Sequence, residues 1–411
     1  MGTPPQQASR TPVLLVNTPT LAPMGADTWI HVEIIRALDR SRFDVHVACS
    51  AGPPGTPTPM YAAIADLPNT EILCVNFGRE RSGDIGVRRF SEVMKDLPAI
   101  VSFFKVAVHI RRERIPIIHT VSRPRDALAC VLLGRITRTK CLIHMHVAFG
   151  EWMSRSLRWS VRHADGLVAI SQFVRDSLVS GGVPSERIFL AHNGIVFKDW
   201  TPAADRSEVR RELQIPMSGP LVVSVSRLFR NKGTAELVRA IAVVRNEIPD
   251  VKLVVIGRDT SGGTYLSELH KIVEDEGLQD NVTFVGQRSD VPRFMAAADV
   301  FAMPSFEEPF GIVFAEAMAM QLPVVALNNG GTPEVVTNGS AGLLSEPGDD
   351  KTLAENLLTL LRDPDLRQQV GTYGRERVKN HFTVEHMARA LEAIYETMAD
   401  PTLEPPRHSR H

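Results

Sequence analysis

Two glutamates in the segment SFEEPFGIVFAEAMA are the first candidates for chemistry in this chain. Glu308 and Glu316 have seven residues between them, including Pro309 and Gly311. In a helix their positions lie about 12 Å apart along the axis, whereas the paired carboxyls of glycosidases lie about 5–10 Å apart. The spacing argues against an acid–base pair and favours two groups that hold different parts of one long ligand. A carboxylate at a helix N-terminus and a solvated helix glutamate are the structural alternative.

A basic loop in VSVSRLFRNKGTAEL offers ligands for an anion. Arg227 directly follows a β-rich run, and Lys232 and Gly233 precede a helical pattern. Cations beside a helix N-terminus favour anion binding, because unpaired N–H groups and the helix dipole act in the same direction. The loop lacks the GxxxxGK[ST] pattern of a P-loop, so ATP hydrolysis is not indicated. A solvated basic loop, with Arg230 as a third surface charge, is the alternative.

Glycines after other β-rich runs mark places where a ligand can approach the backbone. In LPVVALNNGGTPEVV we expect Gly330 and Gly331 to expose N–H groups, with Thr332 as a helix N-cap and Pro333 as the first helical residue. Gly25 stands at an equivalent strand–helix junction in LAPMGADTW. An ordinary glycine-rich turn is the alternative.

Two histidines raise the question of a metal site. His144 and His146, in KCLIHMHV, have the spacing of one face of a strand. No third ligand of suitable spacing accompanies them in the sequence, which favours a histidine pair at a strand end over a zinc site.

The elements that would position these residues alternate between strands and helices. Strands are expected at TPVLLVN, FDVHVACS, IPIIHTV, KCLIHMHV, DGLVAIS and RIFLAHNG, and again at PLVVSVS, VKLVVIG, NVTFVGQ, DVFAMPS and LPVVALN. Nearly continuous Val/Ile/Leu runs separated by helices indicate parallel sheets covered on both faces. Because 411 residues exceed one ordinary core, we predict two doubly wound α/β domains joined near residues 195–205. Ligands of such sheets bind beyond the carboxyl ends of the strands.

Composition excludes several classes of protein. A net charge of −1 argues against a general polyanion binder, so no nucleic-acid partner is expected. The N-terminus lacks the apolar core of a signal peptide, and no apolar run is long enough to span a membrane. Four cysteines without CxxC spacing are interpreted as reduced. These features predict a cytoplasmic enzyme or binding protein.

Taken together, the motifs resemble the family-four glycosyltransferases of the GT-B fold (glycosyl transferases group 1). The chain carries SRLFRNKG, FEEPFGIVFAEAMA and NNGGTPEVV in the family's order, together with HADGLVAIS and AHNGIVF. The resemblance extends from about Val13 to Met398. It implies two Rossmann-like domains facing across a cleft and a C-terminal helix that returns to the N-terminal domain. The implied limits are 1–198 for the acceptor-side domain, 199–382 for the nucleotide-sugar-binding domain, and 383–411 for the crossover helix and polar tail.

The resemblance also implies roles for individual residues. Arg227 and Lys232 would neutralise the diphosphate of a nucleotide-sugar donor. Glu308 would bind sugar hydroxyls, and Glu316 the ribose hydroxyls of the nucleotide. His146 would face the sugar from the N-terminal domain. Further backbone contacts with the donor are implied for Gly25, Phe310, Gly311, Ile312 and Gly331.

The implied reaction is transfer of a hexosyl unit to a hydroxyl acceptor, a sugar or lipid-linked glycan, with retention at the anomeric carbon. Arg227 and Lys232 would take the place of a metal ion, so neither a metal nor another cofactor is expected. Asp363-Pro364-Asp365 resembles the metal-binding DxD of other glycosyltransferases, but Pro364 indicates a turn between helices. A nucleotide-sugar epimerase and a non-catalytic nucleotide-sugar-binding protein are the alternatives.

Contact with a membrane surface is a separate question. Arg88, Arg89, Arg111, Arg112 and Arg114 cluster around apolar residues of the first domain. Such a basic amphipathic surface suits anionic lipid and a lipid-linked acceptor, which would place the protein at the inner membrane face. A solvated helix face is the alternative that the neutral overall charge favours.

Overall fold

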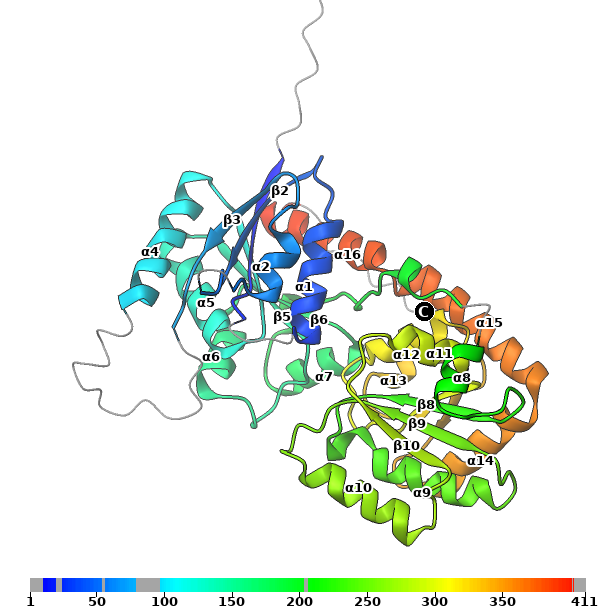
Figure 1. The fold of residues 1–411 in the computed structure, drawn as a ribbon. Coiled ribbons are helices and arrows are strands. Elements are labelled where there is room, and N and C mark those ends of the chain that lie inside the picture. The colour runs from blue at the N-terminus through cyan, green and yellow to red at the C-terminus, as the bar shows by residue number, and fades with distance from the viewer. Residues whose placement is uncertain are drawn as a thin grey trace, which may run out of the picture. The chain divides into compact units, whose positions relative to one another are not determined.

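The computed structural model describes residues 10–19, 24–53, 56–78, 97–202, 206–400 and 402. It divides into two compact units, Met1–His192 with Val384–His411, and Asn193–Thr383. Each unit is built on its own parallel sheet (Figure 1). The expectation of two doubly wound α/β units is confirmed.

The first unit contains a seven-stranded sheet in the order β3-β2-β1-β4-β5-β6-β7. Every neighbouring pair is parallel. The strands are β1 (Thr11–Val16), β2 (Phe43–Cys49), β3 (Thr70–Cys74), β4 (Ile117–Val121), β5 (Lys140–Met145), β6 (Gly166–Ala169) and β7 (Ile188–Leu190). Most of their residues are buried, as strands covered by helices on both faces require.

Helices cover both faces of this sheet. The helices α1 (Ala26–Ala37), α2 (Pro59–Ile64) and α16 (Val384–Ala399) form one group, in which α1 contacts α2 and α16, and α16 contacts β4. The helices α4 (Leu97–Arg112), α5 (Pro124–Thr137) and α6 (Arg155–His163) form a second group, with α5 against β4 and β5. Helix α7 (Gln172–Ser180) packs on β6 and β7, and the 3-10 turn η1 (Ser185–Arg187) precedes β7.

The C-terminal helix belongs to this first unit. Arg42, next to β2, donates to Glu392 of α16 at 2.8 Å and to Glu396 at 2.5 Å. The N–H of Asp39 donates to the other carboxylate oxygen of Glu392 at 2.8 Å. The predicted return of the last helix to the N-terminal part of the chain is therefore confirmed.

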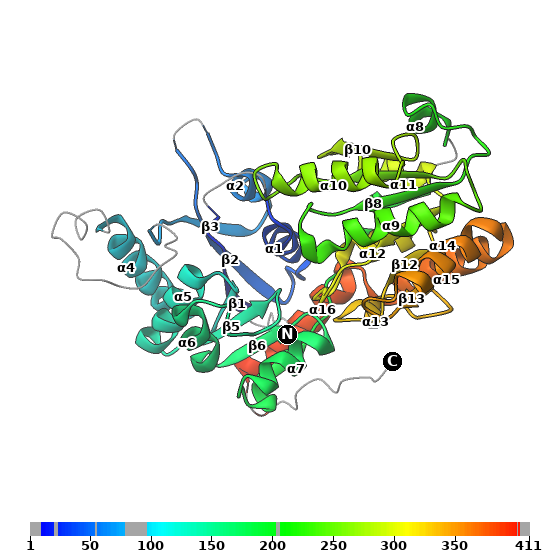
Figure 2. The same cartoon turned by 90° about the horizontal axis from the view of Figure 1, so that it is seen from below.

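The second unit contains a six-stranded parallel sheet in the order β10-β9-β8-β11-β12-β13. Strands β8, β10, β12 and β13 of this sheet are labelled in Figure 2. Its strands are β8 (Leu221–Val225), β9 (Lys252–Ile256), β10 (Val282–Gly286), β11 (Val300–Met303), β12 (Val324–Leu327) and β13 (Gly342–Ser345). Its helices are α8 (Ser207–Glu212), α9 (Thr234–Arg245), α10 (Thr264–Asp275), α11 (Val291–Ala297), α12 (Ile312–Ala319), α13 (Thr332–Val335), α14 (Asp350–Arg362) and α15 (Pro364–His381), with 3-10 turns η2 (Phe197–Asp199) and η3 (Arg230–Lys232).

Alternation along β11 shows how this sheet is covered. Val300 and Ala302 pack into one apolar cluster with residues of α9, α10 and α14. Phe301 points to the opposite face, where its ring lies edge-on to Phe314 of α12, with centroids 6.1 Å apart. Because successive strand residues face opposite sides, helix α12 is held against the sheet directly beyond the loop that carries Glu308.

Asp363-Pro364-Asp365 forms a helix start. The carboxylate of Asp363 accepts the N–H of Leu366 at 2.9 Å, and Pro364 is the first residue of α15. The segment lies between helices α14 and α15 as expected, but only Asp363 is outside a helix, so the predicted turn is instead the N-terminus of α15, with a capping carboxylate and a proline at its first position.

Candidate functional site

The predicted donor-binding residues of the second unit follow three neighbouring strands. Arg227 and Lys232 come after β8, Glu308 comes after β11, and Gly331 comes after β12. These strands lie side by side in the order β8-β11-β12. Because parallel strands end at the same edge of a sheet, three loops that are distant in sequence meet at one place.

The first contact between these loops is an ion pair. Lys232 Nζ lies 2.5 Å from Glu308 Oε2, and both side chains are mostly buried, with exposed fractions of 14% and 12%. The hydroxyl of Ser305 donates to the same carboxylate oxygen at 3.0 Å. Two donors thus hold the Glu308 carboxylate, and burial strengthens the attraction relative to a surface pair.

Close contact between backbones fixes the distance between the loop that carries Lys232 and the loop that carries Glu308. Gly233, the N-cap of α9, has φ +70°, and a Cβ atom there would lie 1.9 Å from the carbonyl oxygen of Pro304. The N–H of Phe306 donates to the carbonyl of Asn231 at 2.8 Å. Glycine is required at position 233 because both the left-handed conformation and the close approach exclude a side chain. The backbone contacts of the neighbouring residues Asn231 and Gly233 therefore position Lys232 beside Glu308.

The Gly330-Gly331 turn supports the Glu308 loop from the other side. Gly330 has φ +62°, and a Cβ atom there would lie 2.6 Å from the carbonyl oxygen of Glu308. The N–H of Gly331 donates to that same oxygen at 2.7 Å. This N–H is thus engaged within the protein, contrary to our expectation that it would be exposed to a ligand. Gly331 is also the N-cap of α13, so Thr332 is the first helical residue rather than the cap.

The neighbouring glutamate is held by its backbone. Glu307 has φ 50°, and its N–H donates to the side-chain oxygen of Asn329 at 2.5 Å. A positive φ is uncommon for a residue with a side chain. Asn329 therefore stabilises a turn that places Glu308, rather than Glu307, beside Lys232.

Helix α12 begins at Ile312, and Gly311 is its N-cap with φ +82°. No side chain of the described residues caps this helix, which suits an anion at its first N–H groups. Phe310, whose ring is buried, packs edge-on against Phe382 with centroids 5.6 Å apart. The predicted backbone contacts at positions 310–312 therefore lie on a rigidly packed helix start.

Glu316 lies within α12, one turn and more beyond the helix start. Its residue is half-buried, and desolvation by the surrounding protein raises the pKa of its carboxyl to about 7. The alternative of a fully solvated helix glutamate is therefore wrong. A carboxyl kept out of water without a described charged partner is more typical of a ligand-binding position than of a surface charge.

Arg227 and Arg230 differ in their surroundings. Both residues are exposed. Arg230 forms an ion pair with Glu268 at 2.5 Å and lies over the ring of Tyr265. Among the described residues, Arg227 forms no ion pair or side-chain hydrogen bond. Arg227 is therefore the cation of this loop with a side chain still available to an anion.

The two remaining predicted residues, His146 and Gly25, belong to the first unit. His146 directly follows β5, and burial is the main cause that lowers its pKa to about 4, with Arg123 acting in the same direction and Asp27 opposing it. Gly25 is the N-cap of α1 with an ordinary extended backbone, φ −75°. The ring of His146 is therefore neutral at physiological pH.

His146 is part of a row of histidines that the sequence pattern did not reveal. Its ring stacks on His144 with centroids 4.3 Å apart, His144 stacks on His119 at 5.3 Å, and His31 meets His119 edge-on at 5.0 Å. The hydroxyl of Tyr395, from α16, lies 2.6 Å from Nδ1 of His119. His144 and His146 are thus paired at a strand end, and His31 of α1 and Tyr395 of α16 join the row through His119.

Three positioning residues were missed in the sequence: Asn231, Ser305 and Asn329. Each lies within or beside a quoted motif. Their side chains or carbonyls bind the Glu308 loop. No local spacing could identify Asn231 and Asn329, because each follows a different strand from the Glu308 loop, whereas Ser305 lies only three residues before Glu308 in the same loop.

Several known proteins are similar to this chain in sequence. The chain is 26% identical to N-acetyl-alpha-D-glucosaminyl L-malate synthase of Bacillus anthracis, over 71% of this chain and 77% of the relative. It is 34% identical to a GDP-mannose-dependent monoacylated alpha-(1-6)-phosphatidylinositol monomannoside mannosyltransferase of Corynebacterium glutamicum, over 59% of this chain and 65% of the relative. The match thus spans about two thirds to three quarters of the length of these relatives.

A solved structure shares the fold over nearly the whole chain. The Anabaena protein HepE, in complex with UDP-glucose, superimposes with a TM-score of 0.75 at 23% identity, covering 94% of this chain and 100% of that protein. This likeness establishes the fold.

Two family models match consecutive parts of the sequence. Residues 30–198 match Glycosyltransferase Family 4, and residues 205–377 match Glycosyl transferases group 1. The second match contains both the basic loop after β8 and the Glu308 loop. Together the models span most of the chain and both of its units. The chain therefore belongs to the group 1, family-four glycosyltransferases of the GT-B fold.

Proposed function

We propose that residues 199–382 bind a nucleoside-diphosphate sugar at the loops after β8, β11 and β12, and that residues 1–198 bind the hydroxyl acceptor. The observation that carries this proposal is the mostly buried Lys232–Glu308 ion pair, in the same loop group as the exposed cation Arg227. A donor of this class offers a diphosphate for the cations and hydroxyls for the carboxylates.

Each residue has a distinct part in this proposal. Departure of the nucleoside diphosphate builds negative charge, which Arg227, Lys232 and the N-terminus of α12 stabilise. Glu308 accepts hydrogen bonds from sugar hydroxyls while Lys232 and Ser305 hold its carboxylate in place. Glu316, further along α12, accepts hydrogen bonds from the ribose.

Transfer proceeds with retention in this proposal. The acceptor attacks from the same face as the leaving group, and a phosphate oxygen of the departing diphosphate takes the acceptor proton. His146 and Gly25, in the first unit, retain their predicted roles toward the reacting sugar and the diphosphate. A glycosyl group covalently trapped on Glu308 would overturn the front-side step, because that step forms no bond between enzyme and sugar.

The nucleotide base of the donor can be identified from its effect on the thermal stability of the protein. We propose a UDP- or GDP-linked hexose, supported by the UDP-glucose in HepE and the GDP-mannose dependence of the mannosyltransferase relative. Ligands that bind the folded state raise the thermal midpoint by mass action. A thermal-shift screen of UDP-, GDP-, ADP- and dTDP-sugars should single out one base. Equal shifts for all four, or none, would contradict a specific donor site.

Turnover distinguishes the proposal from its alternatives. With the donor so identified, incubation with hydroxyl acceptors should release nucleoside diphosphate and form a product whose anomeric configuration, read by NMR, equals that of the donor. Isomerised donor sugar in the absence of acceptor would indicate an epimerase. Donor binding without turnover across a broad acceptor set would indicate a binding protein.

A lipid-linked acceptor at a membrane surface is the finer part of the proposal. No described helix is long and apolar enough to cross a bilayer. Helix α4 nevertheless exposes a row of apolar side chains, Leu97, Ile100, Val101, Phe104 and Val108, with exposed fractions from 45% to 65%. Their spacing of three or four residues places them on one helix face. The predicted basic residues Arg88 and Arg89 lie outside the described residues.

Basic side chains accompany this apolar face. Arg111 and Arg112 are exposed near the end of α4, where Arg111 donates to the carbonyl of Ile136 and Arg112 pairs with Glu113. An apolar helix face beside basic residues is typical of a helix lying on anionic lipid. The relative that acts on a phosphatidylinositol mannoside supports a lipid-linked acceptor.

Vesicle flotation tests this contact. The protein should float with phosphatidylglycerol vesicles, and less with phosphatidylcholine vesicles. A Phe104→Ser, Val108→Ser double variant should stay in solution, whereas Val243→Ser, an exposed apolar residue of α9, should float as the wild type does. No flotation of the wild-type protein would favour the solvated helix face.

A further inference from the structure

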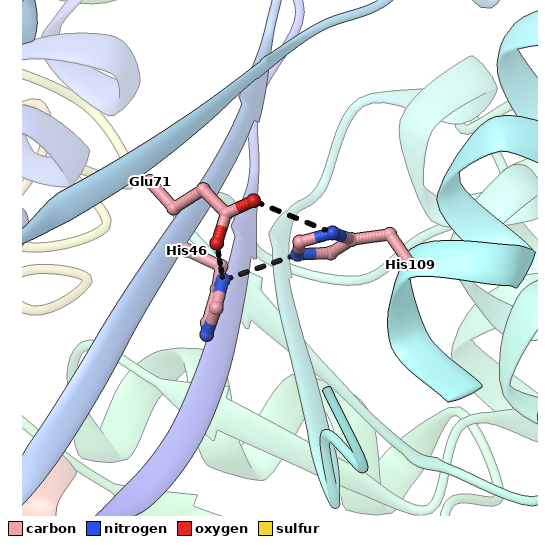
Figure 3. A group of neighbouring side chains, drawn as sticks. All are labelled: His46, Glu71 and His109. Atoms are coloured by element: carbon pink, nitrogen blue, oxygen red, sulfur yellow. Dashed lines mark hydrogen bonds and ion pairs between the residues drawn. The ribbon is translucent and has the colours of Figure 1, made fainter. Parts of the chain in front are cut away.

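Three side chains from different elements of the first unit come together at one edge of its sheet (Figure 3). His46 lies on β2, Glu71 on the edge strand β3, and His109 on α4. His46 and Glu71 are register partners on neighbouring strands, so their side chains point to the same face. Helix α4 covers that face and brings His109 to them.

The separations between their ligand atoms are short. Nδ1 of His46 lies 3.1 Å from Nε2 of His109 and 3.3 Å from Oε2 of Glu71. Oε1 of Glu71 lies 3.7 Å from Nδ1 of His109. Zinc ligands at about 2.0–2.1 Å from the ion and at tetrahedral angles lie about 3.3–3.4 Å apart. The shortest nitrogen–nitrogen and nitrogen–oxygen separations therefore already approach the edges of a zinc tetrahedron.

The contacts of Glu71 fit a shared ion better than direct hydrogen bonds. Charge-assisted hydrogen bonds between nitrogen and carboxylate are about 2.7–2.9 Å long, shorter than the 3.3 Å and 3.7 Å found here. Nδ1 of His46 and Nε2 of His109 share a hydrogen bond at 3.1 Å, and one ligand atom from each of the three residues lies within 4.8 Å of the other two. Two histidines and one carboxylate also form the donor set of zinc sites that keep one position for water.

The site is buried around its two histidines and open to solvent at its glutamate, so it can both admit an ion and hold it. The two histidines are buried, whereas the side chain of Glu71 is 56% exposed and leaves a route from solvent.

We propose that His46, Glu71 and His109 bind a divalent first-row transition metal, Zn²⁺, which ties α4 to β2 and β3. Water would complete the coordination on the exposed side. The ion would have a structural role, because its ligands lie on β2, β3 and α4 and include no residue assigned to donor binding. It would fix the helix whose apolar face is exposed, and it leaves the expected metal independence of sugar transfer unchanged.

Zinc binding to the full chain, expressed without a histidine tag and stripped with a chelator, tests the proposal. Equilibrium dialysis against Zn²⁺ with metal analysis should give one ion per chain, and Zn²⁺ should raise the thermal midpoint. Glu71→Gln and His109→Gln should each lower the zinc affinity at least about tenfold. His270→Gln, which changes an exposed histidine of α10, should leave the affinity unchanged.

The measurements separate loss of the zinc site from loss of the fold. Glu71 is largely exposed, so its substitution keeps the fold, which circular dichroism of the zinc-free protein would verify. Absence of a one-to-one zinc ion overturns the site. Wild-type zinc affinity in either Glu71→Gln or His109→Gln overturns it equally, because the remaining zinc would then be adventitious.

Discussion

Lys232 and Glu308 lie 76 positions apart in the sequence, yet Nζ of one is 2.5 Å from Oε2 of the other. The contact joins the loops that follow β8 and β11, two neighbouring strands of one sheet. It brings together two residues that sequence motifs nominated separately. Because both side chains are mostly buried, loss of either partner leaves the other with an uncompensated polar group.

This pair should behave as a unit in a double-mutant cycle. We expect Lys232→Met to lower kcat/KM at least about 100-fold, the cost of removing one transition-state donor, and Glu308→Gln to lower it as well, because the carboxylate that pairs with Lys232 and accepts from the sugar hydroxyls is lost. The double variant should lose less than the product of the single losses. Each single change should also destabilise the fold by about 1–3 kcal/mol, with partial recovery in the double variant. Additive losses in both kinetics and urea unfolding would show that the two residues act independently.

Arg227 should be needed for turnover and dispensable for folding. Its side chain is exposed, so Arg227→Ala should change the free energy of unfolding by no more than about 0.5 kcal/mol. Loss of a diphosphate contact should lower turnover about 100-fold or more. Arg230→Ala is the matched control, because Arg230 lies in the same loop and already pairs with Glu268. Near-normal turnover of Arg227→Ala would remove this residue from the donor site.

Glu316 should lower the stability of the ligand-free protein at neutral pH and strengthen the binding of the nucleotide. Its carboxyl has a pKa of about 7 in the folded protein against 4.5 in the reference state, because burial disfavours the charge. The folded state therefore favours the protonated form, and this contribution is full below about pH 4.5 and lost as the pH rises through 7. The loss amounts to at most about 3 kcal/mol for the ligand-free protein.

Replacement by glutamine removes this pH-dependent loss. Glu316→Gln should unfold at higher urea concentration than wild type at pH 8, with a smaller difference at pH 5. Calorimetry at pH 8 should show about 10- to 100-fold weaker binding of the nucleoside diphosphate, the cost of one hydrogen bond to a charged group. Glu307→Gln, which alters an exposed neighbour, should change neither quantity. Unchanged nucleotide affinity in Glu316→Gln would contradict a ribose contact.

Gly330 should prove essential for the position of Glu308. Alanine there would meet both a positive φ of +62° and the backbone of Glu308, with its oxygen at 2.6 Å and its nitrogen at 2.8 Å. Gly339 also has a positive φ, +78°, but open space around a new Cβ atom. Gly339→Ala therefore measures the backbone strain alone, about 1 kcal/mol.

Comparison of the two variants isolates the contact with Glu308. Gly330→Ala should cost more stability than Gly339→Ala and should lower kcat/KM, because the Glu308 loop must move. Gly339→Ala should keep wild-type activity. Equal stability losses and equal activities would mean that the Glu308 loop tolerates displacement.

Acid should unfold the first unit through its buried histidines. Burial is the main cause that lowers the folded pKa of His31 to about 3 and of His146 to about 4, from 6.5. Each stays neutral when folded and takes up a proton on unfolding between those values. The free energy of unfolding should therefore be full above about pH 6.5 and fall below it by about 1.4 kcal/mol per pH unit for each histidine.

Urea unfolding from pH 7 to pH 5 measures this slope. His31→Gln should make it shallower by about one proton, whereas His270→Gln, on the exposed face of the other unit, should leave it unchanged. An unaltered slope in His31→Gln would show that this histidine does not contribute to acid unfolding.

The amino-acid sequence by itself determined the two parallel α/β units and the loops that carry the candidate site. Strands such as LVVSV and VVAL are apolar on both faces, and that local property requires helices on both sides of a sheet. The positions of Arg227, Lys232, Glu308 and Glu316 relative to strand ends and helix starts are likewise local. These positions follow from short segments whose order is given directly by the sequence.

Only the tertiary structure decided which of these groups meet. The order of strands in each sheet brings Lys232 to Glu308, turns the N–H of Gly331 onto the Glu308 carbonyl, and gathers His46, Glu71 and His109 at one edge. The raised pKa of Glu316 also depends on the packing around its carboxyl. Strand register and burial join residues dozens of positions apart, so no local spacing contains them.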